Sequence, residues 1–500
     1  MRRAIGWLAA AVLLAGGTVL PAPAEQLRAP DYVMEGYDGD GAGHDWETNL
    51  FFQRMQEDTG IIFEYRQHTG EEEWEQRKRD IALESDLPDV LFKAGLTDEE
   101  TLEMAEKGIL LDLKPYLPEH APDLWKLLEA NPEYMHAVTL PDGTIRALPA
   151  INELPANNLM WINQSWLKSL KLETPRTVEE LTETLRAFRD RDPNRNGRRD
   201  EVPLSALGIW DLRFLAHGFG IVENDYYLSV RDGQVESSLK SEENRAFLAW
   251  LHQLWEEGLL SRQTFATMDS IRQITDEKAD IPYGMFLSSS PLTVVPAAAL
   301  DQYEALDPLS FGGKQVYRDL LGTLTRGTFA LTRSCGNPER MVEWVNRLYT
   351  AEGSILIQAG REGEEFLRTE DGGWEWMADL ATVANEVLPK ATLADGGAAP
   401  GIAERSFQEQ YADSATKRIL EGMGRVQDKA VFPFPLVFLS REDAARAAEL
   451  QAAIAPYADK AMAEFVTGDR PLDDAHWEAF GQELDRRGLE EMKALWQKYI

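Results

Sequence analysis

The chain has 500 residues, of which 44% are hydrophobic and 27% are charged, and its formal net charge is −34. This composition can bury large cores, so it excludes a disordered chain, and the length predicts two or three domains. The acidic balance repels nucleic-acid phosphates and anionic lipid, so we expect no nucleic acid among the partners.

The chain begins with a segment typical of export. Arg2 and Arg3 precede an uncharged stretch, residues 4–20, and the small-residue triplet Ala22-Pro23-Ala24 follows. This pattern predicts a signal peptide over residues 1–24, since the stretch is shorter than the roughly 20 apolar residues of a spanning helix. Cleavage would leave 49 basic against 85 acidic residues, a net charge of −36. We therefore expect a water-soluble protein in the periplasm or outside the cell.

Cysteine usage bears on how the protein is anchored and stabilised. The single cysteine, Cys335, cannot form an internal disulfide. Residues 14–17 look like a lipid-attachment box that lacks its cysteine. We expect no lipid anchor at the cleavage site, which leaves both periplasmic and freely secreted locations open.

Strand and helix patterns then alternate along the chain. Amphipathic helices are predicted over residues 45–59 and 72–85, and short apolar strands at 61–63 and 89–92 follow them. Such alternation predicts an α/β fold. A strand at 159–162 follows a first crossover near residues 149–158. The later helices are predicted at 177–189, capped by Thr177 and Glu180, and at 241–257, 338–351 and 441–500, the last with a break at 468–474.

Residues 192–201 have oxygen-bearing side chains at alternate positions before a glycine. Such spacing lets a tight loop aim several oxygens at one hard cation, and Gly197 permits the sharp turn. The predicted calcium ligands are Asp192, Asn194, Asn196, the backbone carbonyl of Arg198, Asp200 and Glu201. The twelfth position of an EF-hand is Pro203 here, so Glu201 is the substitute for its glutamate. A lone loop with no Met-rich helix favours a structural calcium ion, and an ordinary polar turn is the alternative.

No motif for catalysis is present. The chain has no His-Glu-x-x-His helix, Gly-x-Ser-x-Gly elbow, phosphate-binding loop or paired CxxC. A glycosidase pair among the 85 carboxylates stays open, because nothing in the sequence locates it. We expect a binding protein with no catalytic residues.

A sugar-binding cleft would use aromatic rings that stack on pyranose faces and polar groups that hold hydroxyls. The aromatic candidates at predicted strand ends and loops are Tyr37, Trp161, Trp210, Tyr283, Trp374 and Phe407. The polar candidates are Asp38, Glu153, Asn157, Glu404 and Arg405. The alternative for any single tryptophan is a place in the core.

Taken together, these motifs resemble the extracellular solute-binding proteins of ABC sugar importers, in particular the large branch that includes alginate-oligosaccharide binders and related lipoproteins. The likeness rests on segments in a characteristic order: Glu57 to Ile61, Ser85 to Asp89, Trp161 to Leu172, Thr174 to Thr177, Asp192 to Pro203, Cys335 to Tyr349, Glu352 to Ser354 and Phe465 to Gly468. The loop at Asp192 is the most specific of them.

The resemblance implies a two-lobed periplasmic-binding-protein fold of type II, with discontinuous lobes, a hinge and the ligand between the lobes. We assign residues 25–152 and 326–385 to the N-terminal lobe, and 153–325 and 386–500 to the C-terminal lobe. It also implies structural calcium at the Asp192 loop, an oligosaccharide ligand, delivery to an ABC permease and a monomeric protein. A polysaccharide lyase or glycosidase, and a sensory binding protein that docks on a receptor, remain as alternatives.

Overall fold

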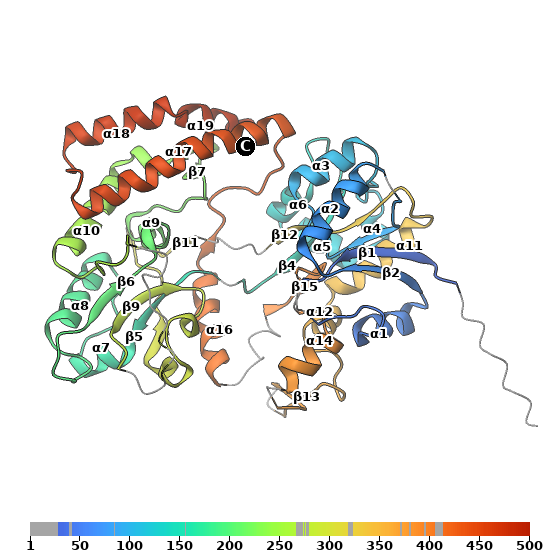
Figure 1. Cartoon of the computed structure of the whole chain (residues 1–500), viewed down its shortest axis with the longest axis horizontal. Coiled ribbons are helices and arrows are strands. Elements are labelled where there is room, and N and C mark those ends of the chain that lie inside the picture. Colours follow the sequence, from blue (N-terminus) through green and yellow to red (C-terminus); the bar gives the residue numbers. More distant parts are fainter. Residues whose placement is uncertain are drawn as a thin grey trace, which may run out of the picture.

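The computed structural model describes residues 29–39, 43–84, 86–155, 157–266, 274, 276, 280–318, 324–370, 373–379, 382–394, 397–405 and 414–500. The predicted signal peptide and Phe407 lie outside these ranges. The chain forms two α/β lobes that lie side by side, the N-terminal lobe on the right of Figure 1 and the C-terminal lobe on the left.

The N-terminal lobe is built on a six-stranded mixed sheet in the order β15-β4-β12-β3-β1-β2. Its strands are β1 (Tyr32–Tyr37), β2 (Phe63–His68), β3 (Val90–Phe92), β4 (Leu148–Asn152), β12 (Leu324–Leu331) and β15 (Gly401–Ala403). β1 pairs in parallel with β2 and β3, whereas β12 is antiparallel to β3 and β4. The carboxyl ends of β1 and β3 therefore lie at the same edge of the sheet.

Helices cover this sheet, and a small hairpin extends from it. The elements are α1 (Leu50–Thr59), α2 (Glu71–Ala82), α3 (Asp98–Glu106), α4 (Leu117–His120), α5 (Pro122–Ala130), α6 (Pro132–Val138), α11 (Pro338–Asn346), η5 (Arg347–Tyr349), α12 (Ala351–Gln358), β13 (Phe366–Arg368), β14 (Trp374–Trp376), η6 (Val383–Val387) and α14 (Leu388–Ala391). α3 begins in a complete capping box between Thr97 and Glu100.

The C-terminal lobe has a four-stranded sheet in the order β10-β5-β9-β6. These strands are β5 (Leu159–Asn163), β6 (Val202–Ser205), β9 (Tyr283–Ser288) and β10 (Tyr303–Ala305), and a hairpin of β7 (Leu228–Arg231) and β8 (Gln234–Ser237) lies apart from them. The helices are α7 (Gln164–Leu170), α8 (Val178–Asp190), α9 (Gly208–Leu212), η1 (Arg213–Phe219), η2 (Ser238–Lys240), α10 (Glu242–Glu256), η3 (Pro291–Thr293), η4 (Ala297–Gln302), α16 (Ser414–Gln427), α17 (Arg441–Thr467), α18 (Asp474–Arg486) and α19 (Leu489–Gln497).

Each lobe has its own hydrophobic core. The core of the N-terminal lobe contains Met34, Phe92 and Trp344, and that of the C-terminal lobe contains Trp161 and Phe286. The last three helices pack on the C-terminal lobe, above its sheet in Figure 1, and add their apolar faces to the same core. Separate cores allow the lobes to move as units about the segments that join them.

Those joining segments correct one predicted boundary. We assigned residues 386–500 to the C-terminal lobe, but β15 pairs with β4 in the N-terminal sheet. The side chain of Asn49 also donates to the carbonyl oxygen of Thr392, at 3.1 Å. The N-terminal lobe therefore continues through Ala403, and the short ladder of β11 (Tyr317–Arg318) with β16 (Ala430–Val431) lies beside the crossings.

Candidate functional site

The carboxyl end of β1 is held by a buried ion pair. Asp38 accepts hydrogen bonds from the Trp46 indole at 2.7 Å and contacts His44 Nδ1 at 2.9 Å. Lys93 Nζ, from the end of β3, lies 2.6 Å from the same carboxylate, and both side chains are fully buried. Asp38 therefore anchors the loop that follows β1, and the prediction that it holds a sugar hydroxyl is not supported by this packing.

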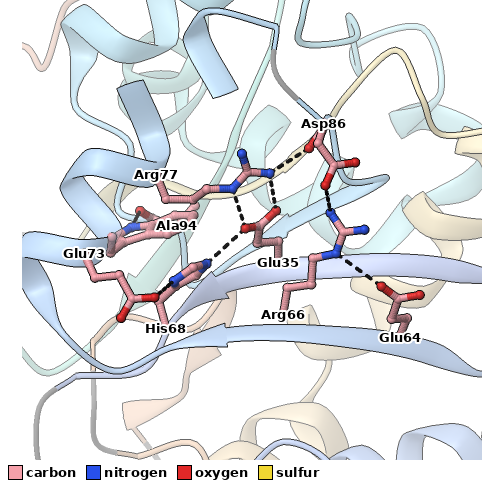
Figure 2. Close-up of polar contacts among 9 residues, drawn as sticks. Glu35, Glu64, Arg66, His68, Glu73, Arg77, Asp86 and Ala94 are labelled. Atoms are coloured by element: carbon pink, nitrogen blue, oxygen red, sulfur yellow. Dashed lines mark hydrogen bonds and ion pairs between the residues drawn. The ribbon is translucent and has the colours of Figure 1, made fainter. Parts of the chain in front are cut away.

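A second charged network joins β1, β2 and α2 (Figure 2). Arg77 donates hydrogen bonds from two guanidinium nitrogens to the buried Glu35 carboxylate, at 2.6 and 2.9 Å, and His68 Nε2 lies 3.0 Å from the same carboxylate. The other ring nitrogen of His68 is 2.9 Å from Glu73. Hydrogen bonding to Glu35 raises the pKa of His68, against the opposing effect of burial. Despite its own burial, Glu35 has a lowered pKa because Arg77 and His68 stabilise its charge.

Three of the predicted stacking residues are core residues instead. Trp161 is completely buried, and its indole donates to the carbonyl oxygen of Ser288 at 2.9 Å. Tyr283 is also buried, and Trp374 packs edge-on against Phe366 at 5.2 Å between ring centroids. Since their ring faces are already in contact with protein, the prediction that they stack on a sugar is wrong.

Trp210 and Tyr37 keep exposed ring surface. Trp210, on α9, is 47% exposed, and its ring meets Phe214 in a T-shaped contact at 5.4 Å. Tyr37 is partly buried at the end of β1. A large exposed indole offers the flat apolar face that a pyranose ring requires.

A pocket of about 520 Å³ lies between the lobes and contains two of the predicted polar residues, Glu153 and Arg405. Glu153, after β4, is exposed and accepts from the backbone N–H of Arg405 at 2.9 Å. The guanidinium of Arg405 pairs with Asp428. Residues from both lobes thus meet here, as a ligand held between the lobes requires.

Of the other predicted polar residues, Asn157 has a structural role, and Glu404 is placed by its backbone. Asn157 is buried and donates to the carbonyl oxygen of Arg318 at 2.7 Å, which joins two crossing segments. Glu404 donates its backbone N–H to the Ser354 hydroxyl at 3.0 Å. Residues that sequence reasoning missed include Lys93, Asn158 and Asp211. A lysine that directly follows the apolar run of β3 was a usable signal, but long-range partners of Asn158 and Asp211 have no local signature.

A larger cavity of about 700 Å³ lies between α3 and α17. Its charged groups are paired, as Asp98 with Arg326 at 2.5 Å and Asp225 with Arg318 at 2.5 Å, and much of the remaining wall is apolar. None of the predicted ligand residues lines it. We therefore place the candidate site at the Glu153 pocket. Trp210 does not line this pocket and remains a separate exposed aromatic candidate.

The loop at residues 192–201 winds tightly around its own side chains. Asp192 accepts from the backbone N–H groups of Asn196 and Gly197, both at 3.1 Å. The Asn196 side chain donates to Asp200 at 3.1 Å. Glu201 Oε1 is buried and has no hydrogen-bond partner among the described residues. Burial and the neighbouring Asp200 and Asp192 carboxylates raise the pKa of Glu201.

This oxygen-rich set fits a hard cation, because a buried carboxylate oxygen without a donor is what a metal ion would satisfy. The carboxylates are not gathered in advance, however. Within the ranges that the structure covers, no three His, Cys, Asp or Glu side chains form a ready-made metal site. The Asn196 amide nitrogen donates to Asp200, and its amide oxygen is the atom that a cation would bind.

Among all the residues that the structure describes, no helix is long and apolar enough to cross a membrane.

Among proteins of known function, the chain is similar to a substrate-binding protein of an ABC transporter. No family model matches the sequence. The chain is 27% identical over 486 residues to the fructooligosaccharide ABC transporter substrate-binding protein FusA of Streptococcus pneumoniae. This alignment covers 91% of this chain and 87% of FusA.

Solved structures of similar fold cover nearly the whole chain. An extracellular solute-binding protein from Bifidobacterium longum subsp. infantis has a TM-score of 0.76 at 22% identity, covering 94% of this chain and 97% of that one. An EF-hand mutant of S. pneumoniae FusA with fructo-nystose gives 0.63 at 23% identity, with 93% and 98% covered. The alginate-binding protein AlgQ2 without calcium ion gives 0.61 at 18%, with 94% and 97% covered. The predicted two-lobed α/β fold is thereby confirmed.

Proposed function

We propose that this chain, a solute-binding protein of the ABC sugar-importer type, captures an oligosaccharide between its lobes and delivers it to a membrane permease. The observation that carries the proposal is the sequence similarity to FusA over 91% of the chain, together with a pocket to which both lobes contribute. Closure of the lobes around a ligand would be an ordinary ligand-driven shift between two conformations.

The similarity supports binding over turnover. FusA is a substrate-binding protein of a transporter, and the match extends over most of both chains. We assign Glu153 and Arg405 to hydroxyl recognition and Trp210 to stacking.

Fructooligosaccharides are the first ligands to test, because FusA is named for them. We assign the ligand to the class of short oligosaccharides, whose apolar ring faces suit one exposed indole and whose hydroxyls suit a few charged groups. The net charge of −34 opposes a polyanionic ligand such as an alginate fragment.

A structural calcium ion is part of the proposal. Asp192, Asn194, Asn196, the Arg198 carbonyl, Asp200 and Glu201 would hold it, and the partnerless buried oxygen of Glu201 supports this assignment. Two structures of similar fold, the FusA EF-hand mutant and AlgQ2 without calcium ion, support it further. The ion would stabilise the C-terminal lobe, because it neutralises carboxylates that otherwise repel one another.

Export is also proposed, on the basic and apolar pattern of residues 1–24. This location would place the ligand site on the outer side of the membrane, where an importer collects its substrate.

The experiment that tests the function is a thermal-shift screen of the purified protein. The panel contains fructo-nystose and other fructooligosaccharides, human milk oligosaccharides, and fragments of alginate and pectin. At least one glycan is expected to raise the melting temperature, with no product found by chromatography after prolonged incubation. A panel that leaves the melting temperature unchanged contradicts sugar capture, and accumulating product would establish the enzyme alternative.

A further inference from the structure

Two neighbouring residues of α9 have opposite surroundings. Trp210 is 47% exposed, whereas Asp211 is 2% exposed. The helix begins after Leu207, whose side chain provides no cap. Asp211 compensates, since its Oδ2 accepts from the backbone N–H of Leu207 at 2.6 Å. The buried carboxylate therefore fixes the turn that presents the indole.

The second oxygen of Asp211 is bonded to a segment that joins the lobes. Oδ1 accepts from the side-chain amide of Asn158 at 2.8 Å, and Asn158 lies between β4 and β5, where the chain passes from one lobe to the other. The carbonyl oxygen of Asn158 accepts from the Tyr317 hydroxyl at 2.5 Å. Tyr317 belongs to β11, which precedes the next crossing. Asp211 is thus joined to two crossing segments through consecutive hydrogen bonds.

Aromatic packing also connects α9 to β11. Phe214 lies between Trp210 and Tyr317, with centroid distances of 5.4 and 6.1 Å. Burial raises the pKa of Asp211 to about 6, so its carboxylate is mostly ionised at neutral pH, and both of its hydrogen bonds are then charge-assisted. An ionised group in this setting is costly unless both oxygens keep their donors.

We propose that Asp211 is a positioning residue for ligand capture, which ties the helix that presents Trp210 to the crossing segment at Asn158. Asp211 does not contact the sugar. It fixes the position of the Trp210 indole relative to the crossing segment at Asn158, so that the ring contacts the ligand when the lobes close. The inference rests on the proposed function and on the stacking role of Trp210. Without the tie, the ring is still present but can reorient, and affinity falls while the fold persists.

The test is a double-mutant cycle read out as the Kd for fructo-nystose, or for the glycan that the thermal-shift screen ranks first. The variants are Trp210→Ala, Asp211→Asn and both together, with Asp232→Asn in the exposed β7–β8 turn as the matched control. Asn at position 211 places an amide donor opposite the N–H of either Leu207 or Asn158. We expect Asp211→Asn to weaken binding about tenfold, the loss of one charge-assisted hydrogen bond. The double variant should bind no more weakly than Trp210→Ala, because the effect of Asp211 passes through the indole.

A second variant guards against simple misfolding. Asn158→Ala removes the tie but leaves Asp211 bonded to Leu207, and it should weaken binding in the wild-type background and not in the Trp210→Ala background. Equal weakening by Asp211→Asn in both backgrounds, or no weakening in either, overturns the inference. Failure of the proposed function is distinct, since the wild-type protein would then bind no glycan of the panel.

Discussion

Asp38 and Lys93 come from the ends of neighbouring parallel strands, and neither side chain reaches solvent. Removing one partner leaves the other charge buried without its counterion, which costs far more than the net value of the pair. We predict that Lys93→Met lowers the free energy of unfolding by about 3–5 kcal/mol, measured by urea denaturation. Lys460→Met, on the exposed face of α17, is the matched control. An equal, small effect of both variants would contradict the anchoring role.

His68 provides a second prediction at the scale of one residue. Its pKa is raised in the folded protein because Glu35 and Glu73 hold its charged form, and Arg77 is the other charged group at Glu35. A raised folded pKa contributes stability that is complete below the unfolded value of about 6.5 and is lost as the pH rises through the folded value. As the pH is raised above about 6.5, the melting temperature of the wild type should therefore fall relative to that of His68→Gln, and parallel curves would contradict the pairing.

For single residues, the sequence indicated which residue types to consider, but it did not indicate which of them are buried or which partners they contact. Trp210 was chosen as an aromatic residue at a predicted loop, and it is exposed, while its stacking role stays a prediction. Trp161 and Tyr283 met the same criterion at strand ends but are buried, since burial depends on the helices that pack over those strands. Asp211 had no signal, because its partner Asn158 is 53 positions away in the sequence.

Among the elements, the loop between α8 and β6 carries the next prediction. Calcium that binds only the folded protein stabilises it in proportion to the logarithm of its concentration, by about 2.7 kcal/mol at one hundred times the Kd. EDTA should therefore lower the melting temperature, and added calcium but not magnesium should restore it. Asp192→Ala should melt like the chelated protein and lose its response to calcium.

The control for this loop is Glu236→Gln, a carboxylate of β8 in the same lobe that is exposed. It should keep the full response to calcium. Identical melting of the wild type with and without EDTA would contradict the calcium assignment and leave the sugar proposal untouched, because the loop and the Glu153 pocket share no residues.

Helices were predicted more closely than strands. The cap of α8 is confirmed, since Thr177 Oγ1 accepts from the Glu180 N–H at 3.2 Å, and α17 ends at Gly468 as expected. The strand predicted at 61–63 is instead β2, Phe63–His68, whose second half is polar because it lies at the sheet edge. A periodicity criterion for buried strands cannot find such a segment.

For the whole molecule, the resemblance to solute-binding proteins of ABC sugar importers predicted the two-lobed architecture, and the comparisons confirm it. The last crossover was placed too early because β15 has only three residues and is recognised only by its pairing with β4. The lobe that a short strand joins is decided by pairing partners distant in the sequence, so local sequence patterns cannot predict it.

Capture between two lobes is the central claim, and a small-angle X-ray scattering titration tests it most directly. The protein is titrated with the glycan that gives the largest thermal shift, and unreacted glycan is quantified in the same samples. We predict a saturable decrease in the radius of gyration, at the concentration where the thermal shift saturates, with all of the glycan recovered intact. A radius of gyration that is unchanged at saturation, or loss of the glycan during the titration, would contradict the account.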